Sequence, residues 1–311
     1  MKRIIVLVLL SALAALPAAL PAGASLPLQV TCFDELPTPG HTGTEGDDTI
    51  YGTAGNDVIR GRGGNDTIYG MGGRDRICGG EGNDVIYGGT GGDLLRGDWG
   101  NDRVYGQGGS DGYLLGDDGN DLLVPGPGSM AFTATIEGGA GRDRIVIAEA
   151  GYHEIFGGPG RDTVDLRQSP LAMLIDLRPV AEGEYLNAGA VPIIGGKAFE
   201  VENVYGSEFD DNIRGSARAN RLDGLGGADH IMGFSGDDFL FGGNGDDWLV
   251  GGAGADSLGG GEAADSIFGG AGDDYLDGGP SVEDWLEGGD GIDTCVDPDG
   301  FIVMDECEAS A

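Results

Sequence analysis

The sequence predicts an all-β solenoid, in which short strands stack on one another along one axis. A nine-residue unit repeats over most of the chain and reads, from Gly52 onward, GTAGNDVIR, GRGGNDTIY, GMGGRDRIC and GGEGNDVIY. The chain has 65 Gly but only 10 Phe and 3 Trp, so a conventional core would not offset the entropy cost of so many glycines. An aliphatic residue two places after an Asp recurs in almost every unit and supplies a narrow, continuous core instead.

Each part of the unit has an expected structure. We number its positions from the first glycine, so that Asp takes position 6 and the aliphatic residue position 8. The first six positions are expected to form a turn, because glycine permits positive φ and lets the backbone approach a ligand closely. The last three are expected to form a short strand with position 8 turned inward, while the flanking Tyr, Arg, Asp and Thr side chains face solvent.

The repeats fall into two blocks. The first, 43–165, runs from Asp48 through Asp111 and, after one inserted residue placed at Leu115, through Asp121; isolated copies follow from Gly138 and Gly157. The second block, 206–296, begins GSEFDDNIR and ends GGDGIDTCV after another one-residue slip. The spacer between them, 166–205, is irregular and more apolar. It is too short for an independent core, so we expect it to stack on the solenoid, with a small inserted module as the alternative.

The two ends of the chain have other expected roles. Lys2 and Arg3 precede an apolar stretch, and Ala22-Gly23-Ala24 offers a small-residue cleavage site, so 1–24 is interpreted as a secretory signal peptide and the protein as secreted and extracellular. A lead-in covers 25–42. The segment 297–311 is interpreted as a cap, because the open end of a solenoid invites association. No other stretch is long and apolar enough to span a membrane.

Charge excludes several classes of partner. Asp and Glu total 53 against 17 Lys and Arg, a net charge of -36, and removing 1–24 makes it -38. Nucleic acid and anionic membrane surfaces are therefore disfavoured. A compact chain with this charge repels itself unless multivalent cations neutralise it. Calcium fits best, because it takes six to eight oxygens from carboxylates and carbonyls, whereas magnesium demands tighter octahedral geometry.

The unit GGxGxDxUx resembles the RTX, or hemolysin-type, calcium-binding repeat family. The resemblance covers most of the mature chain. It implies a right-handed parallel β-roll with two repeats per coil and several Ca²⁺ ions bound between adjacent turns. Because so many carboxylates would repel one another without a cation, calcium binding is also expected to be coupled to folding.

In this family the repeat Asp supplies the carboxylate ligand. The resemblance therefore assigns as metal ligands Asp48, Asp57, Asp66, Asp75, Asp84, Asp93, Asp102, Asp111, Asp121, Asp143, Asp162, Asp211, Asp229, Asp238, Asp247, Asp256, Asp265, Asp274 and Asp293. Asn220 takes the place of Asp in one unit, where calcium is expected to bind weakly or not at all. Asp284 is left out, because an extra residue in its unit is expected to displace it. Ala263 stands where a turn glycine belongs.

Four cysteines remain in the mature chain and permit three pairings. Disulfides are expected in an exported protein. Cys32–Cys78 and Cys295–Cys307 are the preferred pairs, because cysteines at opposite ends of a rod cannot meet. A zinc site is the alternative, although no CxxC spacing is present.

The sequence favours a protein that is not an enzyme. It has no HExxH motif, and GxSxG at 108–112 falls inside a repeat without the strand-to-helix turn that this motif requires. We expect a structural, adhesive or calcium-sequestering protein, whose surface partner could be a cell-surface or matrix polysaccharide. The alternative is a carbohydrate-active enzyme with a groove near 125–202, where carboxylates would converge with Arg142, Arg144 or Arg161.

Overall fold

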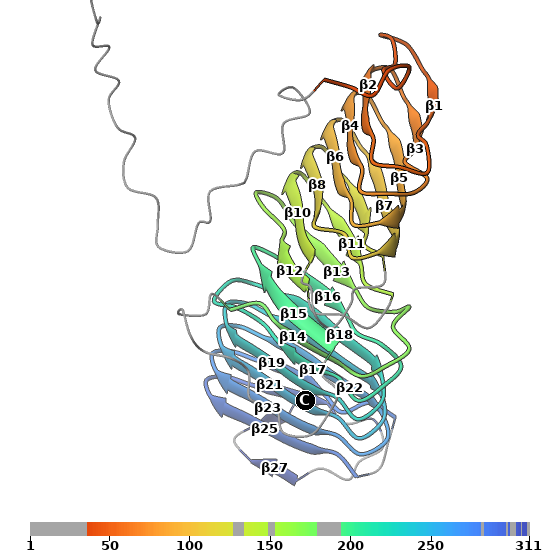
Figure 1. The fold of residues 1–311 in the computed structure, drawn as a ribbon. Coiled ribbons are helices and arrows are strands. Elements are labelled where there is room, and N and C mark those ends of the chain that lie inside the picture. The colour runs from red at the N-terminus through yellow and green to blue at the C-terminus, as the bar shows by residue number, and fades with distance from the viewer. Residues whose placement is uncertain are drawn as a thin grey trace, which may run out of the picture.

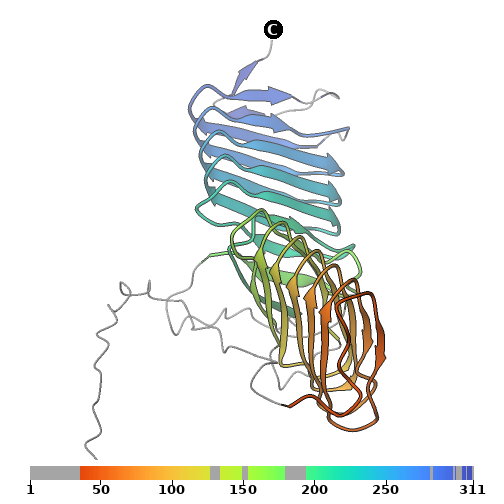
Figure 2. The ribbon, with the colours of Figure 1, turned by 90° about the horizontal axis from the view of Figure 1, so that it is seen from above.

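The protein forms a solenoid of parallel strands in two sheets. The computed structural model describes residues 36–126, 134–148, 153–178, 194–280, 283–296, 298, 303–305 and 307–309. The predicted signal peptide, 1–24, lies outside them, as does the lead-in up to residue 35. The described residues form strands and turns but no α-helix, and hence no helix that could cross a membrane. Figures 1 and 2 show the coils stacked from β1 at one end to β27 at the other.

Among the described residues each sheet has fourteen strands, and successive strands alternate between the sheets except in the spacer. The first sheet contains, in spatial order, β1 (Thr49–Tyr51), β3 (Thr67–Tyr69), β5 (Val85–Gly91), β7 (Arg103–Gly109), β9 (Leu122–Val124), β11 (Arg144–Val146), β13 (Thr163–Asp165), β16 (Asn203–Tyr205), β18 (Arg221–Gly226), β20 (Phe239–Asn244), β22 (Ser257–Glu262), β24 (Tyr275–Asp277), β26 (Thr294–Val296) and β28 (Glu308–Ala309). The second sheet contains β2 (Val58–Gly63), β4 (Arg76–Glu81), β6 (Leu94–Trp99), β8 (Tyr113–Asp118), β10 (Ala134–Ala140), β12 (His153–Phe156), β15 (Ile194–Phe199), β14 (Met173–Asp176), β17 (Asn212–Arg214), β19 (His230–Ser235), β21 (Trp248–Ala253), β23 (Ser266–Ala271), β25 (Trp285–Asp290) and β27 (Val303–Asp305).

The register confirms two units per coil. Ile50 pairs with Ile68 in the first sheet, and Ile59 with Ile77 in the second, so a coil advances by two nine-residue units. Position 8 points inward in both sheets, and its aliphatic side chains stack into one core that is almost wholly shielded from solvent. Burying one such side chain contributes about 1.5–3 kcal/mol. The described core therefore owes its stability to many small contributions from aliphatic side chains and contains no large aromatic cluster.

Many strands are longer than the expected three residues. β20, for example, continues from its aliphatic residue into the glycines of the next unit, where Gly243 pairs with Leu225 and with Gly261. Glycines at positions 1 and 2 thus extend the sheet ladder, and the turn is confined to the remaining positions before Asp.

The inserted residue of the first block is Gly112; its placement at Leu115 was wrong. Leu94 pairs with Tyr113 and Leu95 with Leu114, so Leu114 takes the inward position and is fully buried. The backbone N–H of Gly112 donates to the carbonyl oxygen of Asp93, which accommodates the extra residue directly after Asp111.

The spacer supplies strands to both sheets. β14 and β15 pair in parallel, and the spatial order is β12, β15, β14, β17. β15 follows β14 in the sequence but lies between β12 and β14 in the sheet. β16 then returns the chain to the first sheet. All four residues of β14 are buried, and the carboxylate of Asp176 among them is paired with Arg178 at 2.7 Å. The connection between β14 and β15, at 179–193, lies outside the described residues.

Aromatic side chains mark the outer faces of the two blocks differently. On the first sheet, Tyr51, Tyr69, Tyr87 and Tyr105 stack almost in parallel with ring centroids 5.0, 5.0 and 5.1 Å apart. The second block has no such ladder among its described residues.

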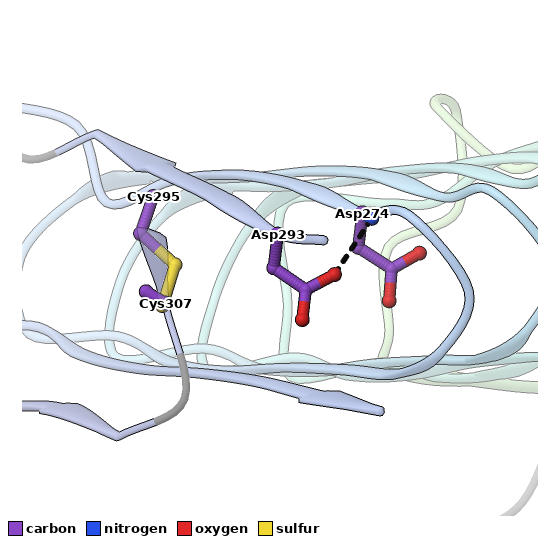
Figure 3. The surroundings of a disulfide bond; sticks show 4 residues. All are labelled: Asp274, Asp293, Cys295 and Cys307. Atoms are coloured by element: carbon purple, nitrogen blue, oxygen red, sulfur yellow. Dashed lines mark hydrogen bonds between the residues drawn. A yellow bond between two sulfur atoms is a disulfide. The ribbon is translucent and has the colours of Figure 1, made fainter. Parts of the chain in front are cut away.

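A disulfide joins Cys295 to Cys307 across 12 residues, which confirms one preferred pairing. Cys295 occupies the inward position of the last unit and is buried, so the bond ties the core to the C-terminal strands (Figure 3). The other predicted pair, Cys32–Cys78, involves Cys32 and therefore lies outside the described residues.

Candidate metal sites

The residues at position 6 form two columns along the solenoid, one before the strands of each sheet. Within a column, most carboxylates accept a hydrogen bond through Oδ1 from the backbone N–H of the position-6 residue one coil earlier. Asp238 donates to Asp256 in this way at 2.8 Å, and Asp256 donates to Asp274 at 2.8 Å. Figure 3 shows the same bond from Asp274 to Asp293. One oxygen of each of these carboxylates is thus occupied by the bond to the preceding coil.

Every Asp that the sequence assigned as a ligand lies in one of these columns. The column before the first sheet contains Asp48, Asp66, Asp84, Asp102, Asp121, Asp143, Asp162, Glu202, Asn220, Asp238, Asp256, Asp274 and Asp293. The column before the second sheet contains Asp57, Asp75, Asp93, Asp111, Asp211, Asp229, Asp247, Asp265 and Asp284.

Glu202 is a member that the sequence reasoning missed. Its Oε2 accepts the N–H of Asp162 at 2.9 Å, and its carbonyl accepts the N–H of Arg221. The signal was present, because Asn203-Val204-Tyr205 precedes Gly206 as a strand triplet does, which places residue 202 at position 6.

Asp284 is not displaced, contrary to expectation. It is 3 % exposed, and its Oδ1 accepts the N–H of Asp265 at 3.0 Å, as in its neighbours. The one-residue slip is taken up between Gly278 and Asp284, before the carboxylate. Asp284 therefore belongs with the candidate ligands.

The second carboxylate oxygen, Oδ2, has no hydrogen-bond donor in most of these turns. These buried Oδ2 atoms belong to Asp66, Asp75, Asp84, Asp93, Asp102, Asp111, Asp121, Asp143, Asp162, Asp229, Asp238, Asp247, Asp256, Asp265, Asp274 and Asp293. A buried polar atom without a partner is costly, and so many in regular array indicate a ligand that they share.

A backbone carbonyl faces most of these oxygens across the first glycine of the turn; Asp111 and Asp293 are the exceptions. A Cβ atom added to Gly251 would lie 2.5 Å from Oδ2 of Asp256 and 2.7 Å from the carbonyl oxygen of Gly269, one coil later. The missing side chain leaves a gap lined by a carboxylate oxygen from one coil and a carbonyl oxygen from the next. These are the oxygen donors that calcium prefers, and two adjacent coils are needed to present them.

Burial raises the pKa of most carboxyls in the columns. Asp238 illustrates this: desolvation, with repulsion from Asp256 and Asp237, raises its pKa to about 7 although the N–H of Asn220 opposes the shift. Burial raises the pKa of Asp229 to about 8. It raises the pKa to about 7 for Asp75, Asp102, Asp162 and Asp265, and to about 6 for Asp84, Asp93, Asp121, Asp143, Asp211, Asp247 and Asp256. A cation bound at Oδ2 would favour the ionised form and oppose these shifts.

Three assigned residues have a different environment. In each of them Oδ2 accepts a hydrogen bond of 2.6 Å from a backbone N–H four residues earlier: Asp48 from Thr44, Asp57 from Thr53 and Asp211 from Ser207. These hydrogen bonds lower the pKa of the Asp48 carboxyl, which is near the open end of the solenoid. Such an oxygen already has a donor inside the protein.

The buried acidic groups outside the columns are paired with arginine. Arg144 and Arg167 both bond to Asp165, and although burial opposes them, they lower the pKa of that carboxyl to about 2. Arg96 pairs with Asp98 at 2.9 Å and also with Asp117. Among the described residues, no three His, Cys, Asp or Glu side chains converge on one point, so a metal ion would need backbone carbonyls as well.

Comparison with known proteins supports the assignment of the columns. The family model of the RTX calcium-binding nonapeptide repeat (4 copies) matches residues 42–77, 79–112, 205–233, 232–264 and 258–280. These matches cover the regular parts of both columns. No curated protein matches the chain.

Proposed function

Because this chain belongs to the RTX calcium-binding nonapeptide-repeat family, we propose that it is a secreted, non-catalytic protein that folds on binding several calcium ions. Its role is structural, adhesive or calcium-sequestering, and a neutral cell-surface or matrix polysaccharide is the partner class that suits its acidic surface. The observation that carries the proposal is the array of buried Oδ2 atoms, most of which face a carbonyl oxygen of the next coil.

Coupling of folding to calcium follows from the position of these oxygens. A single turn presents one free carboxylate oxygen, and the carbonyl that faces it comes from the following coil. The donor set therefore exists only after two coils have stacked. Calcium would neutralise the repulsion between carboxylates along a column, and in its absence the net charge of -36 opposes stacking.

Calcium titration tests this proposal. Far-UV circular dichroism of the mature protein is expected to change from coil to β at roughly 0.1–1 mM calcium, the range of extracellular modules, and magnesium is expected to be much less effective.

A matched pair of variants tests whether the column carboxylates are the ligands. Asp238→Asn is expected to lose one ion, whereas Asp237→Asn removes the same charge from an exposed neighbour outside the columns and is expected to lose none. A fold that persists in chelator at neutral pH, without a response to calcium, would refute the proposal.

The non-catalytic part of the proposal needs its own assay. The calcium-loaded protein is expected to leave polyuronates unchanged, and the fluorescence of labelled neutral glycans would report binding separately. Turnover of an acidic polysaccharide would overturn this part and leave calcium binding intact. Of the arginines considered for such a groove, Arg144 is engaged with Asp165, whose lowered pKa makes that carboxyl unsuited to act as a general acid.

A further inference from the structure

The residue at position 2 divides the turns into two classes. In four turns it is Thr or Ser, and its backbone N–H points at the side-chain oxygen of position 6. These N–H donors are Thr44 to Asp48, Thr53 to Asp57 and Ser207 to Asp211, each at 2.6 Å, and Ser216 to Asn220 at 2.7 Å. The hydroxyl of each Thr or Ser bonds to the same side chain. We call these closed turns.

In the other turns that have Asp at position 6, position 2 has a positive φ. Arg62 has φ of +88°, Phe234 of +77° and Gly252 of +115°. The peptide that precedes such a residue is turned, so that its N–H does not meet the carboxylate, and Oδ2 of Asp66, Asp238 and Asp256 has no donor. We call these open turns. The same correspondence holds along both columns: no Asp with a free Oδ2 follows a Thr or Ser at position 2.

We propose that position 2 decides which turns take calcium: open turns bind it, and the four closed turns are satisfied by their own backbone and bind none. This inference rests on the proposed function, because it specifies which of the candidate ligands are used. It removes Asp48, Asp57 and Asp211 from the set of calcium ligands that the family resemblance assigned.

Asn220 supports this distinction. It is the one amide among the position-6 residues of the columns, and it lies in a closed turn. Its Oδ1 accepts the N–H of Ser216 and its Nδ2 donates to the carbonyl of Glu202, at 3.3 Å, so a neutral side chain fulfils all that the turn requires. A negative charge is dispensable where no cation binds.

The closed turns also have a distinctive location. Those of Asp48 and Asp57 are consecutive and begin the first block, and those of Asp211 and Asn220 are consecutive and begin the second. One closed turn of each pair belongs to each column. Each block therefore starts with one full coil that does not depend on the metal, and the open turns stack upon it.

Asparagine substitutions test the proposal without altering the backbone. Ions bound at saturation are counted by equilibrium dialysis and native mass spectrometry. Asp66→Asn, in an open turn, is expected to lose one ion, whereas Asp57→Asn, in the adjacent closed turn, is expected to lose none, because asparagine can still accept the N–H of Thr53. Equal losses in the two variants would overturn the proposal. If the parent protein binds no calcium at all, the proposed function fails instead.

Exchanging the residue at position 2 tests cause as well as correlation. Thr53→Gly permits positive φ and is expected to add one ion, while Thr90→Gly, at position 3 of an open turn, serves as the matched control. Arg62→Thr is expected to close a turn and remove one ion, and Arg62→Gly should leave the number unchanged. Unaltered ion counts in both Thr53→Gly and Arg62→Thr, with native circular dichroism in calcium, would show that position 2 does not control binding.

Discussion

Removing calcium and then lowering the pH tests the electrostatics of the two columns. The pKa of Asp238 is raised by burial to about 7 and that of Asp229 to about 8, from 3.8. A carboxyl whose pKa is higher in the folded chain binds protons preferentially to the folded chain. Its contribution to stability is therefore fully present below about pH 4 and is lost as the pH rises through the folded pKa, between about 6 and 8.

The size of these pKa shifts decides whether the chain can stay folded without calcium. A rise from 3.8 to about 7 corresponds to about 4 kcal/mol for one group. Neighbouring carboxyls in a column titrate together, so their contributions do not simply add. A typical domain is stable by only about 5–15 kcal/mol, however, and ionising even two or three of these groups without a cation would consume that margin. We expect the solenoid to be unfolded in chelator at about pH 8 and to refold as the pH falls toward 4.

The assay is far-UV circular dichroism of the mature protein in chelator across this pH range. Light scattering at each pH is the control, because the sequence pI is about 4.1 and association is expected near it. Calcium and protons should also compete, so calcium binding near pH 6 is expected to release protons, measured by calorimetry in buffers of different ionisation enthalpy. The reasoning fails if the chain stays unfolded at pH 4, or if it is folded in chelator at pH 8.

Three further predictions concern the calcium-loaded protein. Ala263 has φ of +86° at a position that glycine holds in most other units, so Ala263→Gly should raise the free energy of unfolding by about 0.5–1 kcal/mol in thermal melts, while Ala264→Gly should not. Ile231 is fully buried, and Ile231→Ala should cost about 2–5 kcal/mol in denaturant unfolding; the outward Met232→Ala serves as the control, and equal costs would contradict the assigned inward face. Replacing Cys307 by Ser opens a 12-residue loop and should destabilise the C-terminal end by about 3 kcal/mol, measured by hydrogen exchange over 283–296.

The regular parts of the fold follow from the sequence because one unit specifies both the core and the turn. An aliphatic residue at position 8 can stack only on its equivalent one coil away, so Ile59, Ile77 and Leu95 follow from the phase of the repeat. The carboxylates are brought into columns by the same phase. The inward residues and the columns can therefore be predicted from the period alone, without knowledge of any long-range contact.

Departures from the period were harder to predict. Gly112 and Leu115 are both compatible with one inserted residue, and only strand pairing distinguishes them. The exchange of β14 and β15 in space depends on pairing between segments that have no repeat. The closed turns were missed because the consensus records Asp at position 6 and says nothing of the peptide orientation at position 2, which decides whether Oδ2 meets an N–H.

The tyrosine ladder gives the first block an optical signature. Four phenol rings held 5.0–5.1 Å apart are close enough for their electronic transitions to couple, and this coupling exists only while the coils of β1, β3, β5 and β7 are stacked. Trp248 and Trp285, by contrast, lie on β21 and β25 in the second block. Near-ultraviolet dichroism of tyrosine and emission from tryptophan, with Trp99 replaced by Phe, would therefore follow the assembly of the two blocks as separate events in a single sample.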